Sequence, residues 1–351
     1  MNFTNVVTIM IATYNSEKLL PRTLDAIREQ TYPVELMEIL IIDGGSKDRT
    51  REIAKQYGCR ILDNPKTEPV NAKLIGMREA KGKYLVTIDH DEVLQNPKSI
   101  ENKVRMLEKH SDCKVAFCSG YLCPDDYPGL NQYISEFGDP FSLFIYRFPK
   151  GYGSLGKTVR KYYSVCYENS AGMIVSFEKM KKQPIFELCC VGTMIDRDYF
   201  LTFEGVCEDG SVFVHLFYLM LEKGVNKVVF TKDDPLIHYS VDSLKRYFPK
   251  IKWRICNNVH FSKMGKSGFS GRLSHSGCIK NRKYLFIPYT VLCIPAIVEG
   301  CYLAIDRHNS IFLMHPIFCW YTLIQIVYQY FLKMIGKSPT MTSYDGKKVI
   351  K

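Results

Sequence analysis

Two aspartates at the end of an apolar run are the residues best suited to chemistry in this 351-residue chain. Asp89 and Asp91 follow the run at 84–88, and Glu92 comes next. Carboxylates at positions i and i+2 of an extended segment can both reach a Mg²⁺ or Mn²⁺ ion, which takes oxygen ligands and leaves room for phosphates. Asp-x-Asp is also common in solvated turns. Here the motif follows three strand–helix units, and ligands of open α/β sheets bind at the carboxyl ends of strands. This position favours a metal-binding role over a solvated turn.

The elements that must position this acid pair follow a regular alternation over the first 120 residues. Helix-like stretches and short turns rich in Gly, Asp and Asn separate the apolar runs of strand length. This alternation predicts an α/β fold, with a mostly parallel sheet and helices on both faces. The apolar runs lie at 6–12, 36–42, 59–62, 84–88 and 115–119.

The pattern breaks at 124–182, where aromatic residues, Gly and Pro crowd together and no period holds. We expect a long, partly ordered insertion that covers the site, which is a common way to build substrate specificity. Beyond it the sequence predicts an extended run at 186–196, a helix at 210–223 and a short strand at 228–230.

Two apolar segments near the C-terminus, 284–305 and 311–332, each have about the 20 residues that a bilayer core needs. Lysines and arginines flank the pair on its outer sides, which predicts a membrane-associated helical hairpin with both ends cytoplasmic. Pro288, Pro295 and Glu299 weaken the first segment. A re-entrant or interface-lying hairpin and a buried soluble helix pair therefore stay open as alternatives.

The bulk composition sets broad limits on partners. The formal charge of +11 suits a phosphorylated ligand or an anionic membrane surface, although a merely soluble basic protein has the same balance. Nucleic acid is not expected as a partner, because the basic residues are scattered. The 13 cysteines contain no C-x-x-C, and adjacent Cys189 and Cys190 are poorly placed for an ordinary disulfide. With no signal peptide at the N-terminus, we expect a reduced, cytosolic catalytic domain.

Four segments carry a resemblance to a known family: the opening strand at 7–15, the stretch 41–50 with its Asp-Gly-Gly-Ser turn, the stretch 71–91, and residues 207–224. Together they resemble the inverting, nucleotide-sugar-dependent glycosyltransferases of family 2, which have the Rossmann-like GT-A fold. The resemblance is specific over 5–95, weaker but ordered to about residue 255, and does not cover the apolar tail.

The resemblance implies that the nucleotide lies along the ends of the first strands. Thr13, Tyr14 and Glu17 would hold the nucleoside. Asp43 stands where the family hydrogen-bonds the base, and a carboxylate there suits the imino N–H of uracil or guanine. Alternatively, Asp43 only starts the Asp-Gly-Gly-Ser turn. Lys73 occupies the family's basic position near the phosphates, unless it is a solvated helix lysine.

The resemblance also assigns roles around the acid pair. Asp91 would ligate the metal directly, and Asp89 would face the ribose or a metal-bound water. A divalent cation, Mg²⁺ or Mn²⁺, would bridge the diphosphate as a Lewis acid. His238 is a candidate third ligand, although a lone histidine after a strand is more often structural. Arg254 is a candidate for neutralising the phosphates.

An inverting transfer needs a base that removes the proton of the acceptor hydroxyl as this hydroxyl attacks the anomeric carbon. Asp209 matches the family's base position, and Glu208 is the second choice. The alternative is that these two acids only cap the following helix, where carboxylates interact well with the N-terminal dipole.

Together these inferences predict an enzyme that transfers one sugar from a UDP- or GDP-linked donor, with inversion, to a lipid-linked or saccharide acceptor in glycan or polysaccharide synthesis. The alternatives are a polyprenyl-phosphate sugar synthase and a non-catalytic nucleotide-binding membrane scaffold. The expected organisation is a catalytic domain at 1–255 (nucleotide-sugar half 5–120, acceptor half 121–255), a basic linker at 256–283, the hairpin at 284–335 and a basic tail at 336–351.

Overall fold

The computed structural model describes residues 3–181, 185–188, 190–261, 269–273 and 279–340. The chain forms two compact units, which are described separately. The first comprises Met1–Leu122 and Gly151–His238, and the second comprises Cys123–Lys150 and Tyr239–Lys351. This division differs from the linear order expected from the sequence, because the helical unit takes one segment from the middle of the chain and the rest from its C-terminal part.

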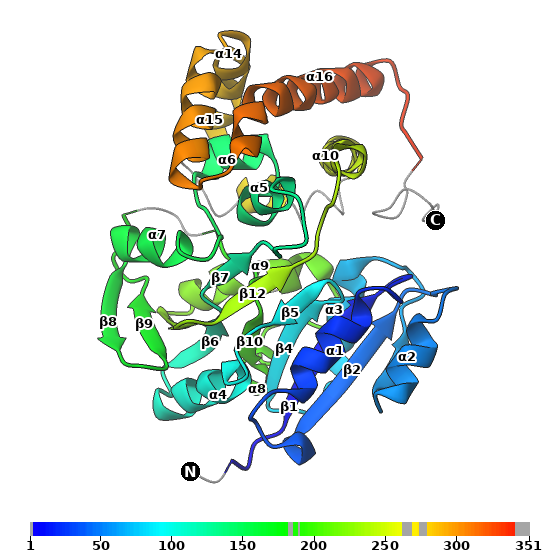
Figure 1. Ribbon diagram of the computed structural model, residues 1–351, viewed down its shortest axis with the longest axis vertical. Coiled ribbons are helices and arrows are strands. Elements are labelled where there is room, and N and C mark those ends of the chain that lie inside the picture. The colour runs from blue at the N-terminus through cyan, green and yellow to red at the C-terminus, as the bar shows by residue number, and fades with distance from the viewer. Residues whose placement is uncertain (1–2, 182–184, 189, 262–268, 274–278, 341–351) are drawn as a thin grey trace. The chain divides into compact units, whose positions relative to one another are not determined.

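A nine-stranded mixed sheet forms the centre of the first unit (Figure 1). The strands β3-β2-β1-β4 are parallel, β6 and β11 are also parallel, and the other neighbours are antiparallel. The parallel part coincides with the alternation seen in the sequence. In sheet order the strands are β3 (Arg60–Asp63), β2 (Met37–Asp43), β1 (Val7–Thr13), β4 (Tyr84–Asp89), β10 (Thr193–Asp196), β6 (Cys113–Phe117), β11 (Lys227–Thr231), β9 (Gly172–Ser176) and β8 (Ser164–Glu168).

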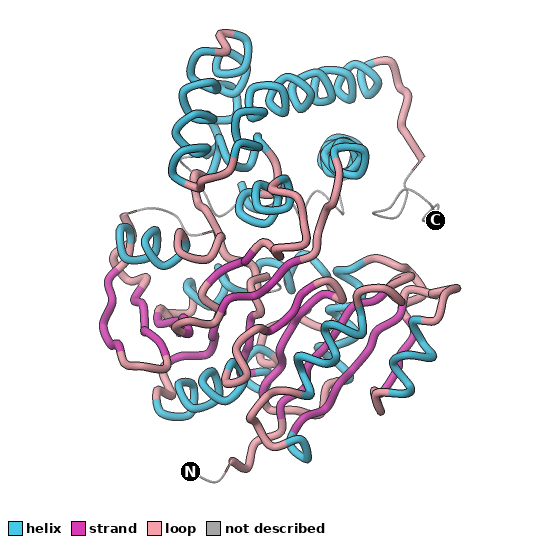
Figure 2. Tube along the Cα trace, viewed as in Figure 1, coloured by secondary structure: helices cyan, strands magenta, loops and turns pink. Residues whose placement is uncertain are grey.

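Helices cover both faces of this sheet, as expected (Figure 2). In α1, Leu20, Leu24 and Ile27 recur at helical spacing and are buried, which gives the helix one core-facing side. The helix α3 packs on β1 and β2 and also against α9. The helices of this unit are α1 (Leu20–Arg28), α2 (Thr50–Gln56), α3 (Pro69–Glu79), α4 (Ser99–Lys109), α7 (Leu155–Tyr162), α8 (Arg197–Phe200) and α9 (Gly210–Glu222), with the 3-10 turn η1 (Val34–Leu36).

A second, three-stranded sheet brings distant segments together. Its order is β5 (Glu92–Leu94), β12 (Pro235–His238) and β7 (Gly120–Leu122). The antiparallel pairing of β12 with β5 sets His238 opposite Glu92. This pairing places a histidine from far along the chain beside the acidic turn after β4.

A buried ion pair ties α4 to the end of β11. The Nζ of Lys103 lies 2.9 Å from Asp234 Oδ2 and 3.1 Å from Cys118 Sγ, and both charged side chains are almost fully buried. The hydroxyl of Thr231 donates a further hydrogen bond to the same carboxylate oxygen at 2.6 Å. Burial of both charges is tolerable because each compensates the other.

Replacing Lys103 by Met is expected to lower the free energy of unfolding by about 3–5 kcal/mol, because Asp234 would be left charged and buried without its cation. Urea denaturation followed by circular dichroism measures this change. The double variant Lys103→Met with Asp234→Asn is the matched control and should recover part of the loss. Equal stability of Lys103→Met and wild type would contradict the ion pair's role.

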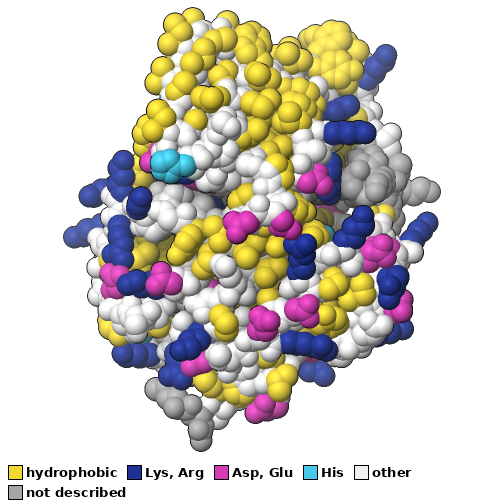
Figure 3. Space-filling model, viewed as in Figure 1, with side chains coloured by type: hydrophobic (Ala, Val, Ile, Leu, Met, Phe, Trp, Pro, Cys, Tyr) yellow, Lys and Arg dark blue, Asp and Glu magenta, His cyan; other side chains and the backbone are white. Residues whose placement is uncertain are grey.

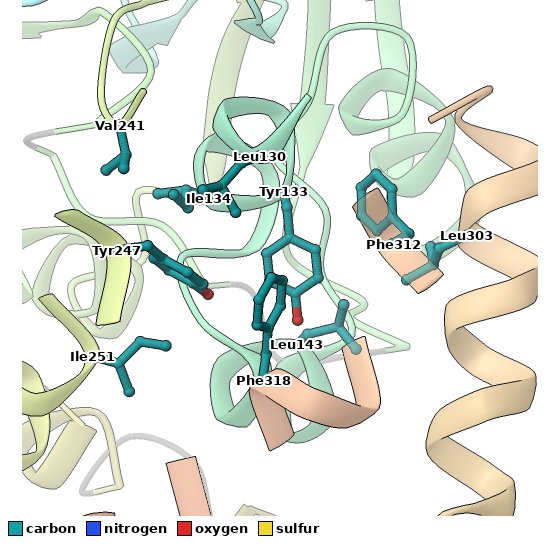
Figure 4. Packing of buried hydrophobic residues seen from close by; sticks show 10 residues of the cluster. All are labelled: Leu130, Tyr133, Ile134, Leu143, Val241, Tyr247, Ile251, Leu303, Phe312 and Phe318. Atoms are coloured by element: carbon teal, nitrogen blue, oxygen red, sulfur yellow. The ribbon is translucent and has the colours of Figure 1, made fainter. Parts of the chain in front are cut away.

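The second unit is helical, and its core is built from aromatic and aliphatic side chains of α5, α6, α10, α15, η4 and α16 (Figure 4). Tyr133 and Phe318 are fully buried there, with ring centroids 5.2 Å apart. The elements are α5 (Leu130–Phe137), α6 (Pro140–Tyr146), α10 (Leu244–His260), α12 (Phe269–Arg272), α13 (Ile279–Arg282), η3 (Lys283–Leu285), α14 (Phe286–Val291), α15 (Ile294–Asp306), η4 (Ser310–Met314) and α16 (His315–Met334).

The expectation of a patternless insertion at 124–182 is wrong for the described residues. This stretch forms α5 and α6 of the helical unit, and then α7, β8 and β9 of the sheet unit. Each of these elements has between five and eight residues. Windows of about 11–18 residues are needed to recognise a period, so such short elements give no readable signal.

The apolar hairpin is present, but its first arm is broken. The helices α14 and α15 meet at a bend of 91°. Cys293 at the break has a φ of 59°, and Pro295 in the first turn of α15 has no N–H to continue a helix from α14. The expectation of a single 20-residue span at 284–305 is therefore corrected to two short helices at a right angle.

One helical stretch among the described residues, Ser310–Met334, is long and apolar enough to cross a membrane, and the bent pair passes the same test only if it is taken as one span. Most exposed large hydrophobic side chains of the described residues lie between Tyr284 and Ile335, the exceptions being Val34, Tyr152, Met180 and Leu201. We call this exposed set between residues 284 and 335 the apolar surface; part of it is seen over α14, α15 and α16 in Figure 3.

Candidate functional site

The carboxyl ends of β1 and β2 form one edge of the candidate site. Thr13 and Asp43 are paired across the two parallel strands, and the Thr13 hydroxyl donates to Asp43 Oδ1 at 3.1 Å. The loops that follow are joined as well, because the Asn15 amide donates to Ser46 Oγ at 2.8 Å. The positive φ of 86° at Gly45 allows the tight turn after β2. These bonds fix the edge where a nucleoside is expected.

Asp43 is engaged by its own turn. Its Oδ2 accepts from the backbone amides of Gly45 and Ser46 at 3.2 and 3.0 Å and lies 3.3 Å from Arg51 Nη1, while its Oδ1 accepts from Thr13 and from the Ser46 hydroxyl. Two carboxylate oxygens offer about four acceptor positions, so these contacts fill them. The structure thus shows the turn-forming role of Asp43.

Tyr14 and Glu17 also lie at the end of β1, as expected. The amide of Tyr14 donates to Ser16 Oγ at 3.1 Å, and Glu17 Oε2 accepts from the amide of Arg49 at 3.1 Å. Glu17 therefore holds the loop before α2, and both side chains are partly exposed. The partly exposed ring of Tyr14 is available to a planar ligand group.

The acidic turn after β4 holds three carboxylates. Glu92 is buried, and its Oε2 accepts the backbone N–H of Asp89 at 3.0 Å, which fixes the turn. Burial raises the pKa of Glu92 well above its ordinary value, and the charges of Asp89 and Asp91 raise it further. His90, between the two aspartates, lies with Nδ1 3.3 Å from the carbonyl of Ala12. This turn concentrates negative charge beside the end of β1.

Lys73 is the cation that faces this turn. It lies in α3, its side chain is only 8% exposed, and its Nζ is 3.5 Å from Asp89 Oδ1. The alternative of a solvated helix lysine is therefore wrong. A buried ammonium beside the acid pair suits a group that holds a phosphate.

His238 reaches the same turn through the pairing of β12 with β5. Its Nε2 lies 3.7 Å from Asp91 Oδ2, and its ring packs on that of Tyr121 with centroids 5.0 Å apart. The structure thus brings together two of the three residues that the sequence predicts as metal ligands, Asp91 and His238. The aromatic contact holds the imidazole in this position.

These residues fit a hard divalent cation such as Mg²⁺ or Mn²⁺. Asp89 Oδ1 is buried and has Lys73 Nζ as its ion-pair partner at 3.5 Å, while Asp91 with His238 offers an oxygen and a nitrogen ligand. No group of three or more acidic, Cys or His side chains in the described part of the chain forms a metal site by itself. The cation would thus need further ligands, which diphosphate oxygens can supply.

The candidate base lies at the start of α9. Glu208 and Asp209 are exposed, and the carbonyl of Asp209 accepts from the amide of Val212 at 3.1 Å, as at a helix N-terminus. Gly210 packs closely on α3, since an added Cβ would lie 2.5 Å from Val70 Cγ1. The helix that carries Lys73 therefore also supports the segment with Asp209.

Arg254 belongs to the helical unit, where its Nη1 lies 3.2 Å from Asp139 Oδ2. Asp139 also caps α6 by accepting from the amide of Ser142 at 2.7 Å. The structure therefore shows Arg254 in an ion pair within its own unit.

The sequence did not nominate two residues that shape the site. Glu92 was noted only as a neighbour of the acid pair, and Tyr121 lies just before the irregular stretch. A third acid directly after Asp-x-Asp is the signal that could have identified Glu92. Nothing local marked Tyr121, because its contact with His238 depends on the pairing of β7 with β12.

Residues 8–200 match the sequence family described as glycosyl transferase family 2, which is more than half of the chain. The chain belongs to glycosyl transferase family 2. The matched region contains the edge at Thr13 and Asp43, Lys73 and the acidic turn, whereas Asp209 and His238 lie beyond it.

Curated relatives within this family are similar over part of their length. An uncharacterized glycosyltransferase of Rickettsia prowazekii is 32% identical over 121 residues, which are 34% of this chain and 37% of the relative. Validoxylamine A glucosyltransferase of Streptomyces hygroscopicus subsp. jinggangensis is 28% identical over 140 residues, 38% of this chain and 33% of the relative. The chain thus spans about a third of the length of these relatives.

A solved structure supports the fold of this family 2 chain. The mannosyltransferase PcManGT from Pyrobaculum calidifontis, in complex with GDP-Man and Mn²⁺, superimposes with a TM-score of 0.50 at 14% sequence identity. The match covers 93% of this chain and 88% of PcManGT. At this identity the likeness shows the fold, and the GT-A expectation is confirmed.

Proposed function

We propose that this protein is an inverting, metal-dependent glycosyltransferase that transfers one sugar from a nucleotide diphospho-sugar to an acceptor at a membrane. The observation that carries the proposal is the acidic turn of Asp89, Asp91 and Glu92, which lies beside buried Lys73 at the carboxyl edge of parallel strands. This edge is where open α/β sheets bind nucleotides. The family match includes the same turn.

Different residues are proposed to hold different parts of the donor. Thr13, Tyr14 and Glu17 are proposed to hold the nucleoside at the end of β1, and Lys73 to hold a phosphate. Asp43 keeps this edge in shape through its turn, and it is also proposed to accept a hydrogen bond from the base. A donor linked to UDP or GDP is consistent with a relative of the fold, PcManGT, which was solved with GDP-Man.

Asp91 and His238 would hold the cation, and Asp89 would face the ribose or a water on the cation. When bound, Mg²⁺ or Mn²⁺ stabilises negative charge on the departing nucleotide as a Lewis acid. The chain's own contribution is the fixed position of these side chains, through the pairing of β12 with β5 and the Glu92 bond to the Asp89 amide.

Asp209 is proposed as the base that removes the proton of the acceptor hydroxyl, with Glu208 as the second choice. Its exposure at the start of α9 suits this role, because a carboxylate there is accessible to an acceptor hydroxyl. Neutralisation of the phosphates by Arg254 stays a prediction from the sequence.

The apolar surface supports association with a membrane. The catalytic part is proposed to lie on the cytoplasmic side, because lysines and arginines flank the apolar pair on its outer sides. Contiguous exposed apolar side chains of this kind mark interaction sites with lipid or protein. The right-angle bend between α14 and α15 favours a hairpin that lies in the interface over a pair of spanning helices. A lipid-linked saccharide is therefore the proposed acceptor.

Donor binding tests this proposal directly. We expect one of a panel of UDP- and GDP-sugars to bind with an affinity that rises in Mn²⁺ or Mg²⁺ and falls in EDTA, as measured by isothermal titration calorimetry. Diphosphate oxygens complete the ligands of the cation, and the cation offsets the charge of the diphosphate. Binding of the donor and binding of the cation should therefore strengthen each other. Absence of binding by every donor, with and without metal, would overturn the proposal.

A further inference from the structure

The side chain of Tyr121 is held at both of its ends. At the backbone end, Tyr121 lies in β7 opposite Leu236 of β12, and its carbonyl accepts the amide of Tyr152 at 2.7 Å (Figure 1). At the other end, its hydroxyl oxygen accepts the backbone N–H of Val191 at 2.9 Å. A ring that is fixed by a strand at one end and by a hydrogen bond at the other cannot swing freely.

Val191, which donates this hydrogen bond, has a backbone conformation that valine rarely adopts. Its φ of 56° lies in the left-handed region, where a β-branched side chain is strained. Its side chain is fully buried, and its carbonyl accepts the amide of Cys118 at 3.0 Å. The stretch 118–121 thus engages both polar backbone groups of Val191. Strain of this kind persists only where the surroundings fix it, and it is concentrated at functional sites.

The ring that is fixed in this way packs on the imidazole of His238, with 5.0 Å between the centroids and 33° between the planes. His238 is the last residue of β12, and its Nε2 lies 3.7 Å from Asp91 Oδ2. At the end of a strand the sheet fixes the backbone but not the rotation of the side chain. The contact with Tyr121 therefore limits how far the imidazole can turn away from Asp91.

We propose that Tyr121 is a positioning residue for the divalent cation. The Val191 amide fixes the Tyr121 hydroxyl, and the ring of Tyr121 orients His238. In this orientation the imidazole and the carboxylate of Asp91 can ligate the same Mg²⁺ or Mn²⁺ ion. The strained turn at Val191 thereby supports the metal site without touching the ion.

This inference rests on the proposed function, in which Asp91 and His238 hold the cation, and it adds the residues that orient the histidine. Groups that orient a histidine ligand contribute about 10- to 100-fold to metal affinity. The expected effect of losing the Tyr121 ring is therefore on the binding of the ion, and it should depend on the presence of His238.

The test is the affinity of the full chain for Mn²⁺ in the presence of UDP or GDP, measured by electron paramagnetic resonance of the free ion. Tyr121→Leu removes the ring contact with His238 and should lower this affinity by about tenfold or more. Tyr121→Phe keeps the ring and removes only the hydroxyl, so its loss should be smaller but measurable. Circular dichroism shows whether each variant is folded, and Tyr121→Phe carries the same comparisons if Tyr121→Leu unfolds.

Two comparisons separate positioning of His238 from a general effect on the fold. In a His238→Ala background, Tyr121→Leu should cause no further loss of affinity, because the residue through which it acts is gone. Tyr167→Leu is the matched control, since Tyr167 also packs on a histidine, His110, with centroids 4.5 Å apart, but lies on β8 at the edge of the main sheet. This control should bind Mn²⁺ as wild type does.

No loss with Tyr121→Leu, or an equal loss with Tyr167→Leu, would overturn the positioning role. An undiminished effect of Tyr121→Leu in the His238→Ala background would overturn it as well. No loss with Tyr121→Phe would overturn the part assigned to Val191. Absence of metal-dependent nucleotide binding in wild type would instead overturn the proposed function on which this inference rests.

Discussion

Replacing Asp209 by Asn is expected to lower the rate of sugar transfer by about 10²- to 10⁴-fold, because general base catalysis contributes on this scale. Asn keeps the shape of the side chain but cannot accept the proton of an acceptor hydroxyl. The exposed position of Asp209 at the start of α9 makes the substitution structurally mild. Donor affinity should be unchanged, since the proposed donor residues lie at the end of β1, on α3 and in the acidic turn.

The measurement is single-turnover transfer together with donor titration on the same preparation. Glu208→Gln is the matched control, because it removes an adjacent exposed carboxylate and should leave the rate near that of wild type. A reversed result would move the base to Glu208. Substantial turnover in Asp209→Asn would instead favour a phosphate acceptor, such as a polyprenyl phosphate, whose oxygen is already ionised and needs no strong base.

The sequence predicted the part of the fold that depends on local pattern. The strands that end at Thr13, Asp43 and Asp89 were each marked by an apolar run followed by polar turn residues, and the structure has them as parallel neighbours. The acid pair was recognisable because both its residue types and its place after a strand carried information. These features need only a few consecutive residues to be visible.

Other features depend on contacts between distant segments. Lys73 is buried because α3 lies between the sheet and α9, which no local pattern of α3 shows. His238 meets Asp91 because β12 pairs with β5. Arg254 has its partner Asp139 in a helical unit that combines two stretches of the chain. In each case the surroundings of a polar side chain are set by packing between distant segments, which no local sequence pattern shows.

The apolar segments at 284–335 were also only partly predictable from the sequence. Its composition predicted a hairpin, and Pro295 in particular indicated a weak point in the first arm. The size of the bend, 91°, follows from the backbone at Cys293, whose positive φ could not be anticipated for a cysteine. In the sequence, Glu299 only weakened the prediction of an apolar span. In the structure it forms an ion pair with Arg147 and accepts a hydrogen bond from the Tyr289 hydroxyl.

Replacing Asp91 by Asn is expected to abolish the metal-dependent part of donor binding and to lower turnover by about 10³-fold, because a metal that stabilises the leaving group contributes several kcal/mol. Asp91 and His238 face each other at 3.7 Å, and the described residues supply no third grouped ligand. The cation and the diphosphate should therefore each bind weakly alone and tightly together.

Titrations of UDP or GDP with and without Mn²⁺, and of Mn²⁺ with and without nucleotide, measure this coupling in both directions. Wild type should show the same enhancement factor in each direction, because the coupling of two ligands is reciprocal. In Asp91→Asn the factor should fall to one, whereas Asp198→Asn, which removes an exposed carboxylate of the same unit, should keep it. Undiminished coupling in Asp91→Asn would place the cation elsewhere and leave the acidic turn as the partner of Lys73 alone.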